Sequence, residues 1–294
     1  RNRAWSQAQF LGTALDIAEN LPAEAFLINL CRNRYHFMLV FAAGLIRQKS
    51  TLLPPSGLEE TVAGIIREYP STRVITDMDE GFNSVPTTDI RSLENGSSPI
   101  RSGPLVPAFD ASQPAAIAFT SGSTGKPRPH PKSWGSLAIT AQLLGDRFMP
   151  ARMETIVATV PSQHMYGLEM TILMALQSGA TLYLGQPFYP KDIQSALSIA
   201  EHTLLVSTPV HLRAVMGGQL EYPALAGVIS ATAPLADSLA QQVETGMQCA
   251  VEEIYGCTEG GSIATRRTLD GPTWTLLDTM KLHEDSGVVI LNAP

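Results

Sequence analysis

The segment from Phe119 to Arg128 gathers two glycines, four hydroxyls and two cations directly after an apolar run. Gly122 and Gly125 allow a tight turn and a close approach of the backbone to a ligand. Consecutive backbone N–H groups flanked by hydroxyls can hold an anion, usually a phosphate, and Lys126 and Arg128 add charge for the same task. The segment therefore indicates a protein that binds the phosphates of a nucleotide.

Two common phosphate-binding loops do not fit this spacing. The Walker loop places four residues between its glycines, whereas Gly122 and Gly125 are separated by two. Pro127 stands where that loop needs a hydroxyl for magnesium, so a P-loop kinase is disfavoured. The Rossmann fingerprint is also absent from the segment. On composition alone, a polar turn between a strand and a helix stays an alternative.

The string from Thr120 to Pro127 resembles, position for position, the phosphate-loop signature of the adenylate-forming superfamily, which includes acyl- and aryl-CoA ligases, peptide-synthetase adenylation domains and luciferases. Arg128 replaces the usual lysine and keeps the charge with another geometry, and Pro129 replaces a glycine and stiffens the loop exit. The resemblance implies that this loop holds the β- and γ-phosphates of ATP. Its binding residues would be Thr120, Ser121, Gly122, Ser123, Thr124, Gly125, Lys126 and Arg128.

Three further segments resemble motifs of the same family, in the family's order. Residues 161–167 look like its Pro-x-x-His-x-x-Gly segment, residues 229–235 stand at the place of a glycine-rich turn, and residues 253–259 look like its Tyr-Gly-x-Thr-Glu segment. A weaker resemblance extends to residues 33–53 and 285–294. Four motifs in order favour the family over chance.

The resemblance implies a site that joins a carboxylate to the α-phosphate of ATP. Charge develops on the phosphates in such a reaction, so donors and magnesium matter more than a proton-transfer base. Catalytic roles fall to Thr258 as a donor to the α-phosphate, to Glu259 as a ligand of Mg²⁺, and to His164 as a gate of the acyl pocket. Tyr255 would stack on the adenine. The nucleotide would also contact Thr232, Ala233, Pro234 and Gly256, and the acid would contact His164, Tyr166, Ser230, Ala231 and Gly256.

Each of these roles has a plainer alternative. Glu259 could be an ordinary solvated carboxylate, Tyr255 a packed aromatic before a turn, and His164 a structural histidine.

No catalytic or binding role is predicted for several other residues. Glu252 and Glu253 are expected to be a solvated pair, Cys257 fills a variable family position, and His130 and His211 have no identifiable partner.

The chain departs from the family pattern in two places. Ala231 and Thr232 stand where many members have paired glycines, and their side chains should narrow or reshape the acyl tunnel. The family also has a ribose-binding aspartate, a hinge and a small lysine-bearing domain after the point that Ala293 and Pro294 reach. We therefore expect an N-terminal core that alone binds ATP with poor or no turnover.

Composition excludes several classes of protein. With 294 residues, 44% of them hydrophobic and 16% charged, the chain can bury a large core. A net charge of −7 argues against a nucleic-acid partner. Three widely spaced cysteines show no metal spacing and fit a reducing cytoplasm. The most apolar stretch, residues 37–46, is too short to span a bilayer, and oligomeric state is not predictable.

Short apolar runs alternate with helical patterns along most of the chain, which predicts parallel sheets covered by helices. Strands are expected at residues 26–30, 51–53, 73–76, 115–119, 155–159, 181–184, 204–207, 227–230 and 250–254. Helices are expected at residues 35–47, 58–69, 132–148, 168–177, 191–201, 210–216 and 236–244. Runs at 263–267, 273–277 and 288–291 indicate antiparallel β-structure.

These patterns predict an α/β fold with helix-covered, mostly parallel sheets and an antiparallel β region near the C-terminus. The resemblance adds that residues 1–294 form a large N-terminal adenylation core, with subdomains at about 1–80, 115–225 and 226–294, a linker at about 80–114, and the small C-terminal lid domain missing. All the motifs follow strands, which is the edge where ligands bind in open α/β sheets.

The leading hypothesis is a cytoplasmic, ATP- and Mg²⁺-dependent ligase that makes an acyl- or aryl-adenylate and passes it to CoA or an acyl carrier protein. Residues 163–169 resemble the ligase-like proteins of aryl polyene and xanthomonadin pigment pathways, which would imply an aromatic acid and pigment biosynthesis. The alternative is a degenerate nucleotide-binding or scaffold protein without turnover. Arg128, Pro129 and the missing glycines fit that alternative, whereas the intact Thr258–Glu259 pair argues against it.

Overall fold

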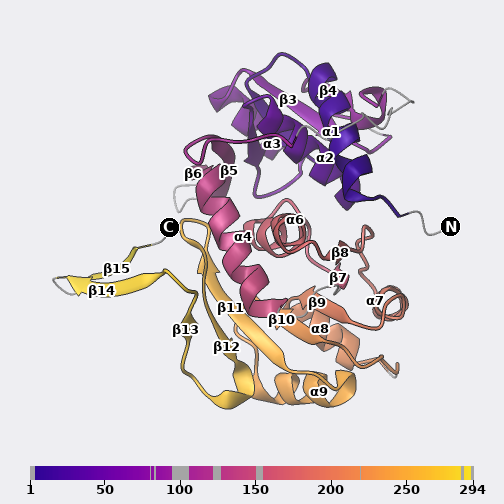
Figure 1. The fold of residues 1–294 in the computed structure, drawn as a ribbon, viewed down its shortest axis with the longest axis vertical. Helices are drawn as coiled ribbons and strands as arrows, with labels where there is room; N and C mark the ends of the chain where they lie inside the picture. The colour runs from indigo at the N-terminus through magenta and orange to yellow at the C-terminus, as the bar shows by residue number, and fades with distance from the viewer. Residues whose placement is uncertain are drawn as a thin grey trace. The chain divides into compact units, whose positions relative to one another are not determined.

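Two compact units make up the chain, residues 1–135 and residues 136–294. The computed structural model (Figure 1) describes residues 4–79, 81–82, 84–94, 106–121, 127–149, 155–218, 220–285 and 288–292. The boundary between the units lies at the start of a helix, whereas the sequence indicated subdomain boundaries near residues 80–114 and 225.

The first unit contains a six-stranded sheet in the order β4-β3-β1-β2-β5-β6. All neighbours pair in parallel except β5 and β6, which are antiparallel. The strands are β1 (Phe26–Asn29), β2 (Ser50–Leu53), β3 (Thr72–Thr76), β4 (Thr87–Asp89), β5 (Pro114–Ser121) and β6 (Pro127–Ser133). The helices are α1 (Gln7–Asn20), α2 (Arg34–Ile46), α3 (Glu59–Glu68) and the short 3-10 helix η1 (Ile90–Ser92).

Strand β6 (Pro127–Ser133) was not predicted, because Pro127, Pro129 and Pro131 occupy alternate positions in it. Consecutive residues of a strand direct their N–H groups to opposite edges, so prolines at alternate positions remove donors along one edge only and leave the other edge able to pair. An edge strand needs only one paired side, and β6 is the edge of this sheet. The helix expected from residue 132 consequently begins two residues later, as α4 (Trp134–Phe148).

The second unit contains a seven-stranded sheet in the order β13-β12-β11-β10-β9-β7-β8. Neighbours from β8 to β11 pair in parallel, and β12 and β13 add antiparallel strands beyond β11. The strands are β7 (Thr155–Ala158), β8 (Thr181–Leu182), β9 (Thr203–Ser207), β10 (Gly227–Ser230), β11 (Val251–Cys257), β12 (Gly261–Arg267) and β13 (Thr275–Leu276).

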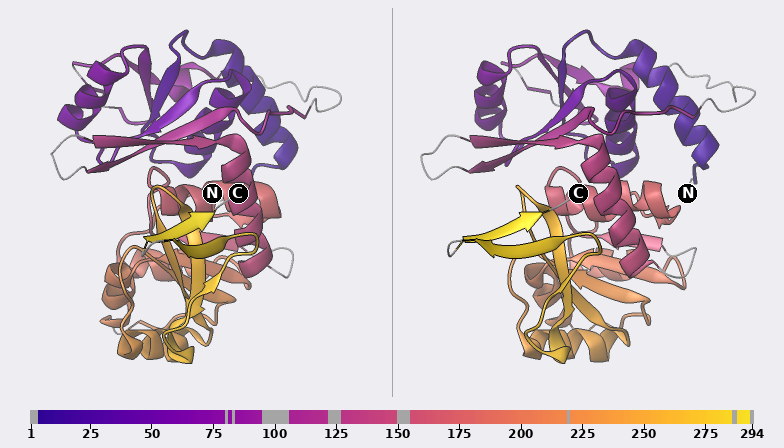
Figure 2. Two further views of the ribbon diagram at one scale, coloured as in Figure 1. Left: turned by 90° about the vertical axis from the view of Figure 1, so that its left-hand side faces the viewer. Right: turned by 60° about the vertical axis from the view of Figure 1, so that its left-hand side comes forward.

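Helices cover both faces of this sheet (Figures 1 and 2). One face packs on α4, on the π-helix η2 (Leu168–Leu173) and on α6 (Met174–Ser178), and the other packs on α7 (Pro190–Leu197), α8 (Pro209–Met216) and α9 (Asp237–Met247). Consecutive strand residues alternate between the two cores: Val228 belongs to the α8–α9 side and Ile229 to the α4–α6 side. A sheet buried on both faces explains why these strands read as continuous apolar runs.

The remaining elements complete the antiparallel region. A 3-10 helix, η3 (Thr268–Asp270), follows β12, and the strands β14 (Lys281–Asp285) and β15 (Val288–Asn292) form a two-stranded hairpin (Figure 2). The predicted fold class, mostly parallel sheets with antiparallel strands near the C-terminus, is confirmed. None of the helices in the described part of the chain is long and apolar enough to cross a bilayer.

Candidate active site

The carboxyl ends of β7, β9, β10 and β11 bring together most of the predicted site residues of the second unit. These strands are parallel neighbours, so their ends lie along one edge of the sheet. Tyr166 precedes η2, Ser230 ends β10, and Tyr255 and Gly256 lie on the last residues of β11. The short helix α5 (Met165–Gly167) carries the first of them.

A row of buried polar side chains crosses this edge on the α8–α9 side. Ser207 is paired with Ser230, and Ser230 with Glu253, so the three side chains lie on one face of the sheet. Thr159 continues the row, with its hydroxyl 3.0 Å from the Ser207 hydroxyl. Ser230 is fully buried, and its Oγ has no hydrogen-bond partner among the described residues.

Tyr166 contacts the ends of the same strands from the α4–α6 side of the sheet. Its hydroxyl lies 3.1 Å from the carbonyl oxygens of both Ser207 and Ile229, so it donates to the ends of two neighbouring strands. Burial raises the pKa of the Tyr166 hydroxyl far above its usual range, although the hydrogen bond to Ser207 opposes the shift. The phenol is therefore neutral, and its hydroxyl is engaged by backbone.

The loop after β10 has an unusual backbone conformation at Thr232. Its φ is 77°, in the left-handed region that favours glycine, although threonine is β-branched. Ala231 is buried, whereas Thr232, Ala233 and Pro234 are exposed. The backbone thus keeps the shape that a glycine would take, and the threonine side chain stands at the surface of the candidate site.

Glu253 holds this loop in place. Its carboxylate accepts a hydrogen bond from the backbone N–H of Leu235 at 2.9 Å, from the hydroxyl of Thr268 at 3.0 Å, and from Arg266, whose Nη2 is 2.7 Å away. Only 3% of Glu253 is exposed, so its prediction as a solvated residue is wrong. No local pattern indicates that Arg266, thirteen residues further along the chain, would pair with it. Its neighbour Glu252 is half-buried, and burial raises the pKa of that carboxyl.

The hairpin of β11 and β12 carries the predicted adenine and magnesium residues. Tyr255 is 58% exposed, and its ring centroid lies 5.6 Å from that of Trp274. The guanidinium carbon of Arg266 lies 4.6 Å from the Trp274 ring centroid. Sequence reasoning missed Trp274 and Arg266, because the antiparallel pairing of β12 with β11 and of β13 with β12 is what brings Trp274 beside Tyr255 and Arg266 over Trp274. The exposed Tyr255 ring can offer a face to a planar ligand.

Gly256 sits at a bulge in this hairpin. The register shifts between Tyr255 and Gly256, and a Cβ atom on Gly256 would lie 2.4 Å from the backbone oxygen of Gly261. Thr258 and Glu259 follow in the turn, half-buried and exposed respectively. An exposed carboxylate fits Mg²⁺, which usually keeps several waters and binds one or two carboxylates together with substrate phosphates. Elsewhere in the described residues, no group of three acidic, histidine or cysteine side chains could hold a metal.

Two histidines border the site. His164 is an exposed residue that precedes α5, and the loss of hydration around its ring lowers its pKa. His211, for which the sequence offered no partner, lies on α8 with its Nδ1 3.2 Å from the Thr159 hydroxyl and 3.1 Å from the Thr208 hydroxyl. Burial lowers the pKa of His211. The sequence signal for the position of His211 is the pair Thr208 and Pro209, the N-cap and first residue of α8, because this pair marks where the helix begins.

The segment predicted to bind phosphate belongs to the first unit. Gly122, Ser123, Thr124, Gly125 and Lys126 lie outside the described residues.

The residues on either side of that segment lie on β5 and β6. Ser121 ends β5, and Thr120 has its hydroxyl 3.1 Å from Nε2 of His130 on β6. Arg128 is exposed and is paired with Thr120. The segment therefore connects two antiparallel strands, rather than a strand and a helix.

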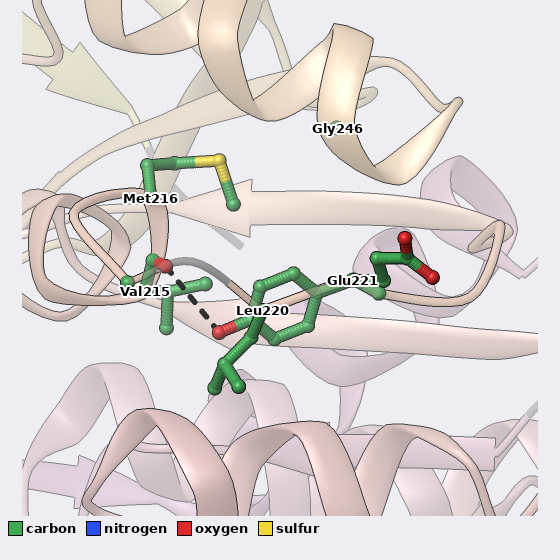
Figure 3. A pocket seen from close by; sticks show the side chains of 7 residues that line it. Val215, Met216, Leu220, Glu221 and Gly246 are labelled. Atoms are coloured by element: carbon green, nitrogen blue, oxygen red, sulfur yellow. Dashed lines mark hydrogen bonds between the residues drawn. The ribbon is translucent and has the colours of Figure 1, made fainter.

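A separate cavity of about 380 Å³ lies near the end of α8 (Figure 3). Met216, Leu220, Tyr222 and Gly246 are among the residues that line it, and the Tyr222 hydroxyl donates to the Val215 carbonyl at 3.3 Å. None of the predicted site residues lines this cavity.

Comparisons with known proteins give a consistent result. A model of the family described as "AMP-binding enzyme" matches residues 24–292. A 4-coumarate–CoA ligase of Rhodobacter capsulatus is 31% identical over 176 residues, which cover 59% of this chain and 44% of the relative. A 4-chlorobenzoate–CoA ligase of an Arthrobacter species is 24% identical over 243 residues, which cover 76% of this chain and 46% of the relative. The chain thus spans less than half the length of these relatives.

Solved structures share the fold. The O-succinylbenzoate coenzyme A synthetase of Bacillus subtilis in complex with AMP superposes with a TM-score of 0.80 at 17% identity, covering 99% of this chain and 79% of that one. The same enzyme with ATP and a magnesium ion gives a TM-score of 0.77 at 17% identity, covering 96% and 62%.

Proposed function

Since the chain belongs to the AMP-binding enzyme family, we propose that it binds ATP and Mg²⁺ and activates a carboxylic acid as an acyl-adenylate. The observation that carries this proposal is the gathering of three motifs from separate parts of the sequence. The segments around Tyr166, Thr232 and Tyr255 all lie at the carboxyl ends of neighbouring parallel strands in one sheet. In open α/β sheets this edge is where ligands bind.

The proposed reaction needs no proton transfer in its first half. A carboxylate oxygen bonds to the α-phosphorus of ATP, and the bond to the bridging oxygen breaks to release pyrophosphate. Thr258 would donate a hydrogen bond to the α-phosphate, Tyr255 would hold the adenine, and Glu259 would hold Mg²⁺, which supplies positive charge to the phosphates. In the second half, a thiol sulfur bonds to the activated carbonyl carbon, AMP leaves, and the thiol proton passes to solvent.

We propose an aryl acid as the substrate and CoA as the acceptor. The 4-coumarate– and 4-chlorobenzoate–CoA ligases among the relatives support both assignments. Ala231 and Thr232 present side chains where the family pattern has glycines, which favours a flat or narrow acid. Transfer to a carrier protein, a pigment pathway and a cytoplasmic location stay predictions from the sequence.

A pyrophosphate-release screen tests the proposal. The complete gene product, assayed with aryl, aliphatic and amino acids, should release pyrophosphate with an aryl acid and Mg·ATP. Glu259→Gln should lower kcat/KM by at least about tenfold, since removal of one group that stabilises transition-state charge typically costs more than that. Glu201 is an exposed residue just before β9, so it lies at the amino ends of the strands, away from the candidate site. Glu201→Gln is therefore the matched control, and its kcat/KM should equal that of the wild type.

The second candidate is a nucleotide-binding protein without turnover, which the strained Thr232 in place of a glycine favours. Calorimetry with ATP and AMP, each with and without Mg²⁺, separates the two. Binding of ATP that does not depend on Mg²⁺, together with no pyrophosphate release for any acid, would overturn the ligase proposal.

A further inference from the structure

Glu169 is a carboxylate in an apolar part of the second unit. It is 2% exposed and belongs to the π-helix Leu168–Leu173, which directly follows the segment of His164 and Tyr166. Isolated buried carboxylates are strongly unfavourable, so such a group must be hydrogen-bonded or paired. Its Oε2 accepts a hydrogen bond from the backbone N–H of Ser262 at 3.1 Å and another from the Ser262 hydroxyl at 2.7 Å.

Gly261 is shaped for the same contact. Its φ is +71°, and a Cβ atom at this position would lie 2.5 Å from Oε1 of Glu169. Only glycine adopts this backbone freely and leaves room for the carboxylate. The first two residues of β12 therefore both fit against Glu169, one by hydrogen bonds and the other by the absence of a side chain.

These two residues end the turn that carries Thr258 and Glu259. Cys257 and Gly261 form the last pair of the β11–β12 hairpin, and the turn spans the three residues between them. The N–H of Gly260 lies 3.2 Å from the sulfur of Cys257, which closes the turn from inside. Glu169 lies outside the hairpin and accepts the two hydrogen bonds from Ser262 on the β12 side of the turn. π-Helices are rare and often occur at functional sites.

We propose that Glu169 is a positioning residue, which holds the Thr258–Glu259 turn in its working geometry through Ser262 and links this turn to the His164–Tyr166 segment. Glu169 itself does not touch the nucleotide or the acid. The inference rests on the proposed function for its effect on catalysis, whereas its effect on the hairpin can be tested without any activity.

Glu244 provides a matched control on the same hairpin. Its carboxylate accepts a hydrogen bond from the N–H of Val251, the first residue of β11, at 3.0 Å, and pairs with Arg267, the last residue of β12, at 2.7 Å. Both glutamates therefore attach the hairpin to a helix, Glu169 near the turn and Glu244 at the opposite end. A general loss of stability would follow from either change, whereas a loss of turn geometry would follow from Glu169 alone.

Hydrogen exchange of the 294-residue chain tests the structural part. In Glu169→Ala, amides of residues 257–262 should exchange at least about tenfold faster than in the wild type, because breaking a buried contact of this kind opens the segment locally. Ser262→Ala keeps the carboxylate and should give a smaller increase in the exchange rate of the same segment. It is the test variant if Glu169→Ala does not fold. Glu244→Ala should loosen residues 251 and 267 and leave 257–262 protected. Equal exchange in all variants, or equal loosening of the turn by Glu169→Ala and Glu244→Ala, would overturn the proposal.

Kinetics of the complete gene product test the catalytic part. Glu169→Ala should lower kcat/KM for Mg·ATP by roughly tenfold to a hundredfold, as small displacements of catalytic groups do. Glu169→Gln keeps an oxygen that can accept from Ser262 and should recover a large part of the loss. Glu244→Ala should keep the wild-type kcat/KM at temperatures where it is folded. If Glu169→Ala keeps wild-type kinetics in an active enzyme, the inference fails and the proposed function stands. If the wild type releases no pyrophosphate, the proposed function fails, and the exchange experiment alone decides the role of Glu169.

Discussion

Replacement of Thr232 by glycine should stabilise the second unit. A left-handed backbone costs an L-residue roughly 1–2 kcal/mol, and Thr232 adopts it with a φ of 77°. Glycine removes this cost but loses about 0.5–1 kcal/mol through the greater freedom of the unfolded chain. The net gain is about 0–1.5 kcal/mol with a midpoint of about 0.75 kcal/mol, and for a unit of residues 136–294 the midpoint raises Tm by about 1.5–3 °C.

Thr279 offers a matched control in the same unit. It is also an exposed threonine in the left-handed region, with a φ of 73°, and it precedes β14, away from the strand ends. In scanning calorimetry, Thr232→Gly and Thr279→Gly should raise Tm by similar amounts. Only Thr232→Gly should change the relative kcat/KM of narrow and bulky acids in the complete gene product. A lower Tm for Thr232→Gly beside a higher Tm for Thr279→Gly would refute the assignment of strain to Thr232.

Three further changes have defined outcomes. Tyr166→Phe leaves two strand-end carbonyls without their donor and should lower the free energy of unfolding by about 1–3 kcal/mol in urea titrations. Gly256→Ala places a methyl group against the Gly261 backbone, which should cost about 1–3 kcal/mol by the same measurement and weaken ATP binding in calorimetry. The lowered pKa of His211 means that the unfolded chain binds more protons, so stability should fall as pH drops through about 6.5. His211→Gln should flatten that part of the stability–pH profile; an unchanged slope would contradict the assignment.

Local patterns were sufficient to predict the buried strands of both sheets, whereas β4 and β6, the two edge strands of the first sheet, were missed. Buried parallel strands have apolar residues on both faces, so β7, β9 and β10 stand out as short apolar runs. Motif residues that directly follow such runs must lie at one edge of a parallel sheet, which is why Tyr166, Ser230 and Tyr255 could be assigned to one site of the second unit.

Pairing between distant segments was not predictable in the same way. The β6 strand was hidden by its prolines, which are tolerated only because β6 has a single neighbour. Trp274 reaches Tyr255, and Arg266 reaches Trp274, through antiparallel pairings whose register no local pattern sets. Glu253 was mistaken for a solvated residue, because its partners Leu235 and Arg266 lie 18 and 13 residues away in the sequence.

Glu253 and Glu169, the two buried carboxylates near this sheet edge, both accept hydrogen bonds from backbone N–H groups. Loops at strand ends leave backbone N–H groups without ladder partners, and an unpaired buried N–H is costly. Glu253 accepts the N–H of Leu235 beyond β10, and Glu169 accepts that of Ser262 beyond the β11–β12 turn. Glu169 could have been recognised from the sequence, since a lone acid within an apolar helix cannot be buried without a partner. Its partner could not be named, because Ser262 lies 93 residues further along the chain. The sequence of this helix thus indicates that Glu169 needs a buried partner, and the fold identifies that partner as Ser262.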